Sequence, residues 1–260
     1  MIHSIRANDP RFKTVTLHGG LNVVLADTTE RSSSHDTRNG VGKTLLMEVL
    51  HFCLGGSSPR TGGLASPQLT GWAFTVELDL GEERCQVTRS LGMPQTVEVV
   101  GDFASWPVEP SWDPELSSFR LTNDEWKTVL GRELFDLVHG SDGVRFGPSF
   151  RLLFPYFARV KTGAYETPFK YFSAQREWQK QVAVASLLDL SWEHAARFQE
   201  LKDQREALRN YKRGIEQGAL GDTQLTLGRL RTNRVGIRKQ IESLEAQLTW
   251  PDPLRSVRPV

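Results

Sequence analysis

The sequence has few of the features that mark secreted, zinc-binding or membrane-spanning proteins. Its two cysteines, Cys53 and Cys85, lack C-x-x-C spacing and a disulfide-rich setting, so they indicate buried, reduced thiols and a cytoplasmic protein. The six histidines are scattered, which argues against a zinc site. No apolar run approaches about 18 residues, and the N-terminus lacks a signal-peptide core. We therefore expect a soluble protein that does not enter a membrane.

An excess of charge of either sign is also missing. The chain has 32 Lys and Arg against 31 Asp and Glu, a formal net charge of +1. Overall charge therefore gives no reason to expect a nucleic-acid or membrane partner, and any such surface must be local. Hydrophobic residues make up 38% of the 260 residues, which is enough for one large or two modest domains with a core.

The most informative stretch is DTRNGVGKT at residues 36–44. Before it, the apolar run at residues 21–26 predicts a buried strand, and after it residues 44–54 predict a buried helix that ends at two glycines. Strand, glycine loop and helix in this order are the context of a phosphate-binding loop. Both a flap over a nucleotide and a plain surface insertion fit the polar residues 27–38.

The residue types in this loop suit a bound polyphosphate. Gly40 and Gly42 allow the backbone to curl and to point N–H groups at the phosphates, at the positive end of the following helix. Lys43 is expected to reach the β- and γ-phosphates and to be the catalytic residue of this chain. The Thr44 hydroxyl is expected to bind Mg²⁺.

The loop departs from the full G-x-x-x-x-G-K-[ST] pattern because Thr37 replaces its first glycine. Residues 27–38 are long enough to turn elsewhere, and the alternative of a chance Gly-Lys-Thr at a glycine-capped helix stays open. We expect ATP and Mg²⁺ as cofactors. The nucleotide-binding residues would be Arg38, Asn39, Gly40, Val41, Gly42, Lys43, Thr44 and Leu45.

Alternating patterns predict strands elsewhere in the first part of the chain. Residues 2–7 and 12–17 read as a hairpin, and three segments with turn residues between them read as an antiparallel meander: 72–80, 84–91 and 95–100. Residues 123–137 have the spacing of a helix, and residues 149–160 form a compact apolar group.

From about residue 174 the composition becomes that of long helices. Glycines predict two helices joined by a loop near residues 217–222 rather than one rod. Four side chains have the spacing of a coiled-coil seam: Ile237, Ile241, Leu244 and Leu248. We therefore expect a head lobe at residues 1–173, a helical coiled-coil segment at 174–248 and an irregular tail at 249–260.

The order of these features resembles the N-terminal head half of SMC-type ABC ATPases, a group that includes RecF and RecN. The resemblance rests on a hairpin with Phe12-Lys13, then LNVVLAD, then RNGVGKTLLMEVLHFCLGG, an antiparallel sheet and a coiled coil. The LHFCLGG ending and the hydrophilic insertion look similar to bacterial SMC-like ATPases of three-component ABC defence systems. The resemblance implies an α/β P-loop NTPase lobe with an antiparallel meander and a C-terminal helical coiled-coil extension.

Such a family implies a head that is split in sequence. A C-terminal lobe carries the signature motif, the Walker B acid pair and a switch histidine, and two heads sandwich two ATP molecules. This chain contains no L-S-G-G-Q, and AVASLLD at residues 183–189 imitates a Walker B strand within helical composition. ATP hydrolysis is therefore expected only once a C-terminal lobe or a second copy completes the site.

The resemblance also suggests further contacts by position. Lys13 would approach the α-phosphate, or would be a solvated strand lysine. Gln175 would contact the metal, or would be a surface residue. Arg151 and Arg159 would contact phosphate or the missing lobe, or form surface salt bridges.

Residues 193–245 contain eleven Lys and Arg against eight Asp and Glu. Phosphate contacts along DNA and a solvated coiled-coil face both fit this local excess. The favoured interpretation is an ATP-driven, DNA-associated machine within a multi-subunit complex of genome maintenance or antiphage defence. A P-loop kinase and a non-hydrolysing, nucleotide-dependent assembly module remain as alternatives.

Overall fold

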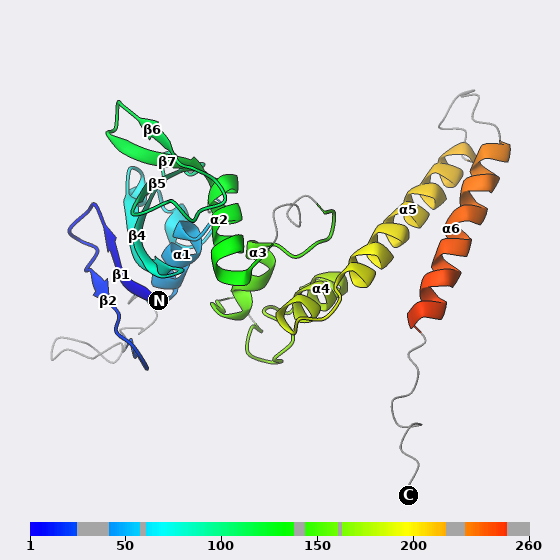
Figure 1. Ribbon diagram of the computed structural model, residues 1–260, viewed down its shortest axis with the longest axis horizontal. Helices are drawn as coiled ribbons and strands as arrows, with labels where there is room; N and C mark the ends of the chain where they lie inside the picture. The colour runs from blue at the N-terminus through cyan, green and yellow to red at the C-terminus, as the bar shows by residue number, and fades with distance from the viewer. Residues whose placement is uncertain (25–41, 58–60, 138–143, 161–162, 217–226, 249–260) are drawn as a thin grey trace, which may run out of the picture. The chain divides into compact units, whose positions relative to one another are not determined.

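The computed structural model describes residues 1–24, 42–57, 61–137, 144–160, 163–216 and 227–248 (Figure 1). The chain divides into two compact units. The first contains Met1–Asp142 and Pro148–Gln175, and the second contains Gly143–Gly147 and Arg176–Val260.

The first unit is built on an antiparallel sheet. Seven strands are found in the described residues: β1 (Ile2–Ala7), β2 (Val15–Thr16), β3 (Ala73–Leu80), β4 (Glu83–Ser90), β5 (Thr96–Val100), β6 (Ser111–Asp113) and β7 (Ser118–Thr122). Their order is β2-β1-β3-β4-β5-β7-β6. The predicted meander is confirmed as β3, β4 and β5, in which Val76 lies opposite Val87 and Val87 opposite Val99.

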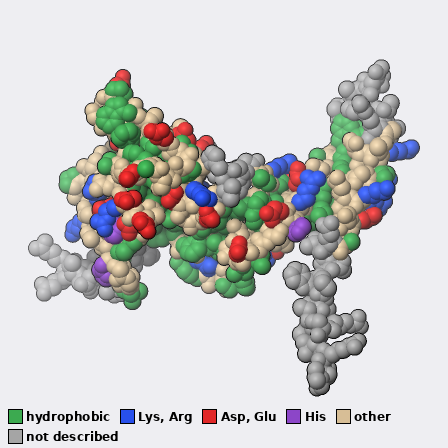
Figure 2. Space-filling view, viewed as in Figure 1, with side chains coloured by type: hydrophobic (Ala, Val, Ile, Leu, Met, Phe, Trp, Pro, Cys, Tyr) green, Lys and Arg blue, Asp and Glu red, His purple; other side chains and the backbone are tan. Residues whose placement is uncertain are grey.

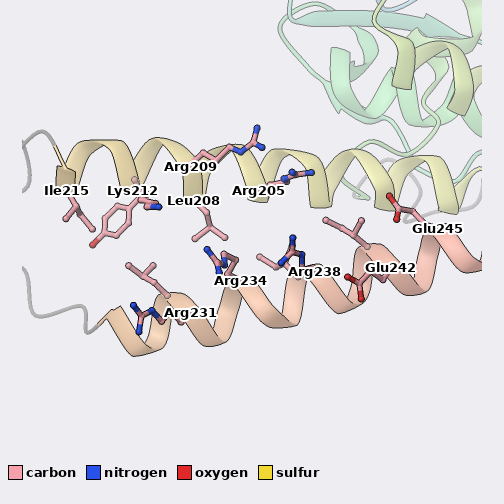
Figure 3. A pocket seen from close by; sticks show the side chains of 14 residues that line it. Arg205, Leu208, Arg209, Lys212, Ile215, Arg231, Arg234, Arg238, Glu242 and Glu245 are labelled. Atoms are coloured by element: carbon pink, nitrogen blue, oxygen red, sulfur yellow. The ribbon is translucent and has the colours of Figure 1, made fainter.

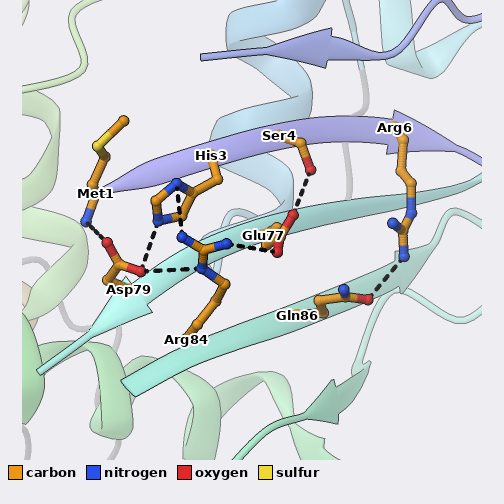
Figure 4. Close-up of polar contacts among 8 residues, drawn as sticks. All are labelled: Met1, His3, Ser4, Arg6, Glu77, Asp79, Arg84 and Gln86. Carbon is orange, nitrogen blue, oxygen red and sulfur yellow. Dashed lines mark hydrogen bonds and ion pairs between the residues drawn. The ribbon is translucent and has the colours of Figure 1, made fainter. Parts of the chain in front are cut away.

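Alternation along the strands separates an apolar face from a polar face. On β3 the side chains of Phe74, Val76 and Leu78 are buried, while their neighbours are partly exposed. This is the pattern of an antiparallel sheet with one face on the core and one toward water. On the polar face, cross-strand pairs link β1, β3 and β4 (Figure 4), and Ser4 donates to Glu77 at 3.1 Å.

Two helices supply the other half of the core. Helix α1 (Lys43–Cys53) contacts β3 and β4, and helix α2 (Asn123–Phe135) contacts β3, β5 and β7. Val49 of α1 and Trp126 of α2 are fully buried within one continuous apolar cluster. The short helix α3 (Phe150–Leu153) and the 3-10 turn η4 (Phe154–Tyr156) complete this packing, and two further 3-10 turns follow α1, η2 (Gly63–Ala65) and η3 (Pro67–Leu69).

The prediction of a buried strand at residues 21–26 is wrong for the part that the structure describes. Leu21, Val23 and Val24 form no strand, and their side chains are 84%, 64% and 50% exposed. The physical reason is that a strand buried on both faces needs neighbours, and β2, the edge strand of this sheet, pairs only with β1 in the described residues. The strand expected at residues 12–17 is likewise reduced to Val15–Thr16.

The second unit is helical. It contains α4 (Glu177–Leu187), α5 (Glu193–Glu216) and α6 (Leu227–Leu248). The prediction of two long helices in place of one rod is confirmed, although the connection expected near residues 217–222 and the tail at 249–260 lie outside the described residues. Residues 183–187 belong to α4, so AVASLLD is not a strand. None of the helices in the described part of the chain combines the length and apolar character that crossing a membrane requires.

Candidate functional site

Helix α1 begins directly after a glycine in the left-handed conformation. Gly42 precedes the helix with φ of 77°, in the left-handed region that favours glycine, and its carbonyl accepts from Leu46 N at 2.8 Å. No side chain caps this end, and the first turn contains no acidic residue. Among the described residues, no side chain accepts from the first amides of α1, which lie at the positive end of the helix.

The described loop residues are placed as follows. Thr44 is exposed, so its hydroxyl is accessible, and Leu45 is half-buried against the core. Lys43 is the first residue of α1. Four of the expected nucleotide-binding residues lie outside the described residues: Arg38, Asn39, Gly40 and Val41.

The other end of α1 is held by three donors from other elements, of which Trp126 and Arg89 are buried and Arg151 is partly buried. Trp126 Nε1 donates to the carbonyl of Cys53 at 2.9 Å, and Arg151 Nη1 donates to the carbonyl of Leu54 at 2.9 Å. Arg89 Nη1 donates to the carbonyls of Phe52 and Gly56, the second at 2.9 Å. These donors satisfy carbonyl groups that a helix end leaves without partners and place positive charge at its negative end.

Both arginines are cations that the fold has enclosed. Burial lowers the pKa of Arg89 to about 10, and burial also lowers the pKa of Arg151 to about 10. Each therefore remains charged at neutral pH, and each is held by carbonyl oxygens. Arg89 also lies over the ring of Phe52, with Cζ 4.2 Å from the ring centroid.

Two glycines let the chain leave α1 close to its own backbone. Gly55 has φ of 77°, and the N–H of Gly56 donates to the carbonyl of His51 at 2.8 Å. A Cβ at Gly56 would lie 2.4 Å from that carbonyl oxygen, which is closer than real Cβ contacts. The Gly-Gly at the end of the expected helix is therefore a steric requirement of this turn.

His51 joins α1 to the segment that follows α3. Its Nε2 lies 2.7 Å from the carbonyl of Ala158, and its Nδ1 lies 3.2 Å from Nη2 of Arg151. Since a carbonyl only accepts and a guanidinium only donates, these contacts require the neutral tautomer with the proton on Nε2. His51 and Arg151 line a cavity of about 460 Å³, together with Glu48 and Tyr171.

The structure gives Arg159 a local role. It donates to three carbonyl groups of the loop that follows it, those of Ala164, Thr167 and Pro168. Arg151 and Arg159 thus hold backbone carbonyls, and the structure shows no salt bridge for either of them among the residues it describes.

Gln175 is 4% exposed, so the expectation of a surface residue is wrong. Its carbonyl oxygen accepts from Tyr171 N at 3.1 Å, and its amide donates to Tyr156 Oη at 2.9 Å. Lys13, the other residue suggested by position, is exposed.

The two thiols are buried in the fold. Cys53 and Cys85 are buried and reduced, and burial raises the pKa of each thiol to about 12, so both are neutral and unreactive at physiological pH. No group of three His, Cys, Asp or Glu side chains suited to a metal ion occurs among the described residues.

Comparison with protein-family models, curated proteins and solved structures finds no match. The functional interpretation therefore depends on the residues themselves. Arg89 and Trp126, which hold the end of α1, were not expected from the sequence. A signal for Arg89 exists, because it follows Cys85 and Val87 at two-residue spacing and so continues the buried face of β4.

Proposed function

We propose that the first unit binds ATP with Mg²⁺ at the start of α1 and is the N-terminal half of an SMC-like ABC ATPase head. The observation that carries the proposal is the left-handed Gly42 followed by a helix that begins with Lys43 and Thr44 and whose start no described side chain caps. Amides at such a helix start bind phosphate, and a lysine followed by a threonine supplies a cation for the phosphates and a hydroxyl for the metal.

The anchoring of α1 supports this proposal. A phosphate site needs donors held in fixed positions, because ordering them on binding would reduce affinity. The far end of α1 is fixed by Arg89, Trp126 and Arg151, and its middle is buried in the core. The helix start is therefore presented by a rigid element.

Hydrolysis would require a second lobe. The sequence contains no signature motif, and residues 183–187 of AVASLLD are helical, so no acid pair that could activate water is evident in the part of the chain that the structure describes. In the proposed head, a C-terminal lobe or a second copy faces the bound ATP. The exposed apolar residues Leu21, Val23 and Val24 are consistent with a surface that such a partner covers.

Calorimetry with Mg-ATP on the folded chain tests the proposal. We expect saturable binding that Lys43→Ala weakens by about tenfold or more, because the lysine carries a charge-assisted contact to phosphate. Lys239→Ala, an exposed lysine of α6, is the matched control and should bind as the parent does. No heat with Mg-ATP, or equal affinity of the Lys43→Ala and Lys239→Ala variants, would remove the nucleotide site.

The same samples separate the alternatives. A head half predicts ATPase activity that appears only after a C-terminal lobe is added and that rises steeply with protein concentration. Phosphate transfer to a small acceptor by this chain alone would instead support the kinase. ATP binding that drives assembly without any turnover would support the non-hydrolysing module.

The proposed partner is DNA, bound through its phosphates. Four basic residues recur on α5 at spacings of three, four and four, which places them on one face: Lys202, Arg205, Arg209 and Arg213. Figure 2 shows Lys and Arg side chains along the surface of α5 and α6. We further propose that the chain works with other subunits in a complex of genome maintenance or antiphage defence, in which these basic residues would contact DNA.

Filter binding of duplex DNA over a range of salt concentrations tests this part separately. Each phosphate contact that is lost should reduce the slope of log affinity against log salt by about 0.9. Lys202→Glu should therefore weaken binding and flatten the slope. Glu206→Gln, which removes a nearby negative charge, should strengthen binding. Binding that does not depend on salt would exclude DNA from the proposal.

A further inference from the structure

Helices α5 and α6 of the second unit lie side by side and antiparallel, and they enclose an open groove of about 930 Å³ (Figure 3). Leu208 and Ile215 point from α5 into the gap, and Arg234 and Arg238 point into it from α6. The groove is therefore lined both by apolar side chains and by charged side chains.

The apolar component is incompletely covered. Leu208, Ile237 and Ile241 line the groove and are only half-buried, and Ile215 is 43% exposed. In a closed pair of helices the side chains of the seam are the buried ones. Aliphatic surface exposed along a groove gains free energy when another apolar surface covers it.

The charged side chains that line the groove are mostly basic. The groove is lined by two glutamates, Glu242 and Glu245, and by six basic side chains: Arg205, Arg209, Lys212, Arg231, Arg234 and Arg238. Within the described part of the chain, Arg205, Arg234 and Arg238 form no ion pair with a carboxylate. Like charges gathered along one groove repel, so the groove favours an occupant that brings carboxylates or other anions.

We propose that this groove docks an amphipathic, acidic helix of a partner protein. An aliphatic stripe on that helix would cover Leu208, Ile237 and Ile241, and Asp or Glu side chains beside the stripe would pair with the arginines on both walls. This is helix-in-groove recognition with charges that fix the partner and its register. The proposal concerns the second unit and does not depend on the nucleotide site, but the partner helix would compete with DNA for Arg205 and Arg209, which belong both to the groove and to the basic face of α5.

Two other occupants fit the groove less well. A second copy of this chain would bring its own α5 and α6, so arginine would face arginine. Nucleic acid would satisfy the arginines through phosphate but would leave the aliphatic residues in water. The half-buried leucine and isoleucine side chains are therefore the observation that favours a protein helix.

The test uses the full chain and a synthetic peptide of about three heptads, with leucine at the a and d positions and glutamate beside them. A scrambled peptide of the same composition and charge is the control for plain electrostatic attraction. Fluorescence anisotropy should show that the amphipathic peptide binds at least about tenfold more tightly than the scrambled one.

Matched variants place the peptide in the groove. Arg238→Glu reverses a charge in the lining, and Lys239→Glu makes the same change at the adjacent residue, which is outside the lining. We expect Arg238→Glu to weaken binding by about tenfold, as charge reversals at interfaces do, and Lys239→Glu to change it by less than about twofold. Ile237→Ser should weaken binding as well, because the proposal requires apolar contact. Circular dichroism establishes that each variant keeps its helices.

Three results would overturn the proposal. Equal binding of the amphipathic and scrambled peptides would mean that the peptide binds through its net charge alone and not through an apolar stripe. Equal effects of Arg238→Glu and Lys239→Glu would place any binding outside the groove. Duplex DNA that binds in a manner dependent on Arg238 but not on Lys239, with no peptide binding, would assign the groove to nucleic acid.

Discussion

At the scale of single residues, the end of α1 depends on a few side chains that donate to its carbonyl groups. Trp126 is fully buried and donates to Cys53 at 2.9 Å. We expect Trp126→Phe to destabilise the fold by about 3 kcal/mol, because it removes a hydrogen bond to a buried carbonyl and leaves a cavity. Urea unfolding measures this. Trp112→Phe, at a tryptophan that is 54% exposed, should change stability by less than about 0.5 kcal/mol.

Gly56 is a second position at which a single side-chain atom should change the stability of the fold. A Cβ there would meet the His51 carbonyl at 2.4 Å, so Gly56→Ala must displace the end of α1. We expect a loss of about 2 kcal/mol or more, as for other forced shifts of packed backbone. Gly19→Ala is the control, since a Cβ at Gly19 meets no atom within 4 Å. Equal unfolding midpoints of the two variants would contradict this account of the turn.

The polar face of the sheet should respond to acid. The pKa of Asp79 lies below its usual value, mainly because of the hydrogen bond with His3 and also because of Met1 N (Figure 4). A lowered folded pKa means that the aspartate stabilises the fold above its unfolded pKa, and that this contribution is lost as the pH falls through the folded pKa. Unfolding midpoints of the parent and Asp79→Asn should therefore differ at neutral pH and converge below the ordinary range of aspartate. A difference that persists in acid would contradict this.

At the scale of elements, α2 begins with a complete capping box. Thr122 Oγ1 accepts from Glu125 N at 3.2 Å, and the Glu125 carboxylate accepts from Thr122 N at 2.7 Å. Thr122→Ala should destabilise the fold by about 1 kcal/mol, whereas Thr122→Ser keeps the hydroxyl and should retain most of the stability. Thermal or urea unfolding of the pair is the measurement, and equal losses in both variants would exclude the cap as the cause.

The strands and helices that could be predicted are those with a strong local period. Polar and apolar side chains alternate along residues 73–80, and residues 123–135 carry apolar residues at helical spacing after a capping box. Each pattern marks one face of the element for burial, and it can be read without knowing which elements pack against that face. Residues 21–24 are as apolar as these elements but have no partner strand in the described residues. A continuous apolar run needs neighbours on both sides, and local sequence does not show whether they exist.

At the scale of the whole molecule, a ligand that binds only the folded first unit should raise its stability. Mg-ATP at about a hundred times its Kd should add about 2.7 kcal/mol to the free energy of unfolding of the unit that binds it. Thermal unfolding followed by tryptophan fluorescence should show this shift in the parent and a smaller one in Lys43→Ala at the same ATP concentration. A shift of the same size in both would mean that ATP acts elsewhere.

Part of the candidate site could be predicted, and part could not. Glycine, lysine and threonine at residues 42–44 are adjacent in the sequence, so this part of the site could be recognised without the fold. The structure places these residues at the start of a helix. The spacing along β4 marks Arg89 as buried, but the contacts of Arg89, Arg151 and Gln175 could not be predicted, because each residue contacts groups that the fold brings together from elsewhere in the chain. Arg151 and Leu54, for example, are 97 residues apart in sequence.

The sequence by itself determined the periods of the strands and helices, the glycines at both ends of α1 and the local excess of basic residues on the second unit, because these depend on neighbouring residues and on the geometry of one element. Only the tertiary structure decided which polar groups are enclosed, which apolar runs find a partner and which arginines gather around a groove. Burial and charge pairing are properties of side chains brought together from distant positions, and only the folded chain brings them together.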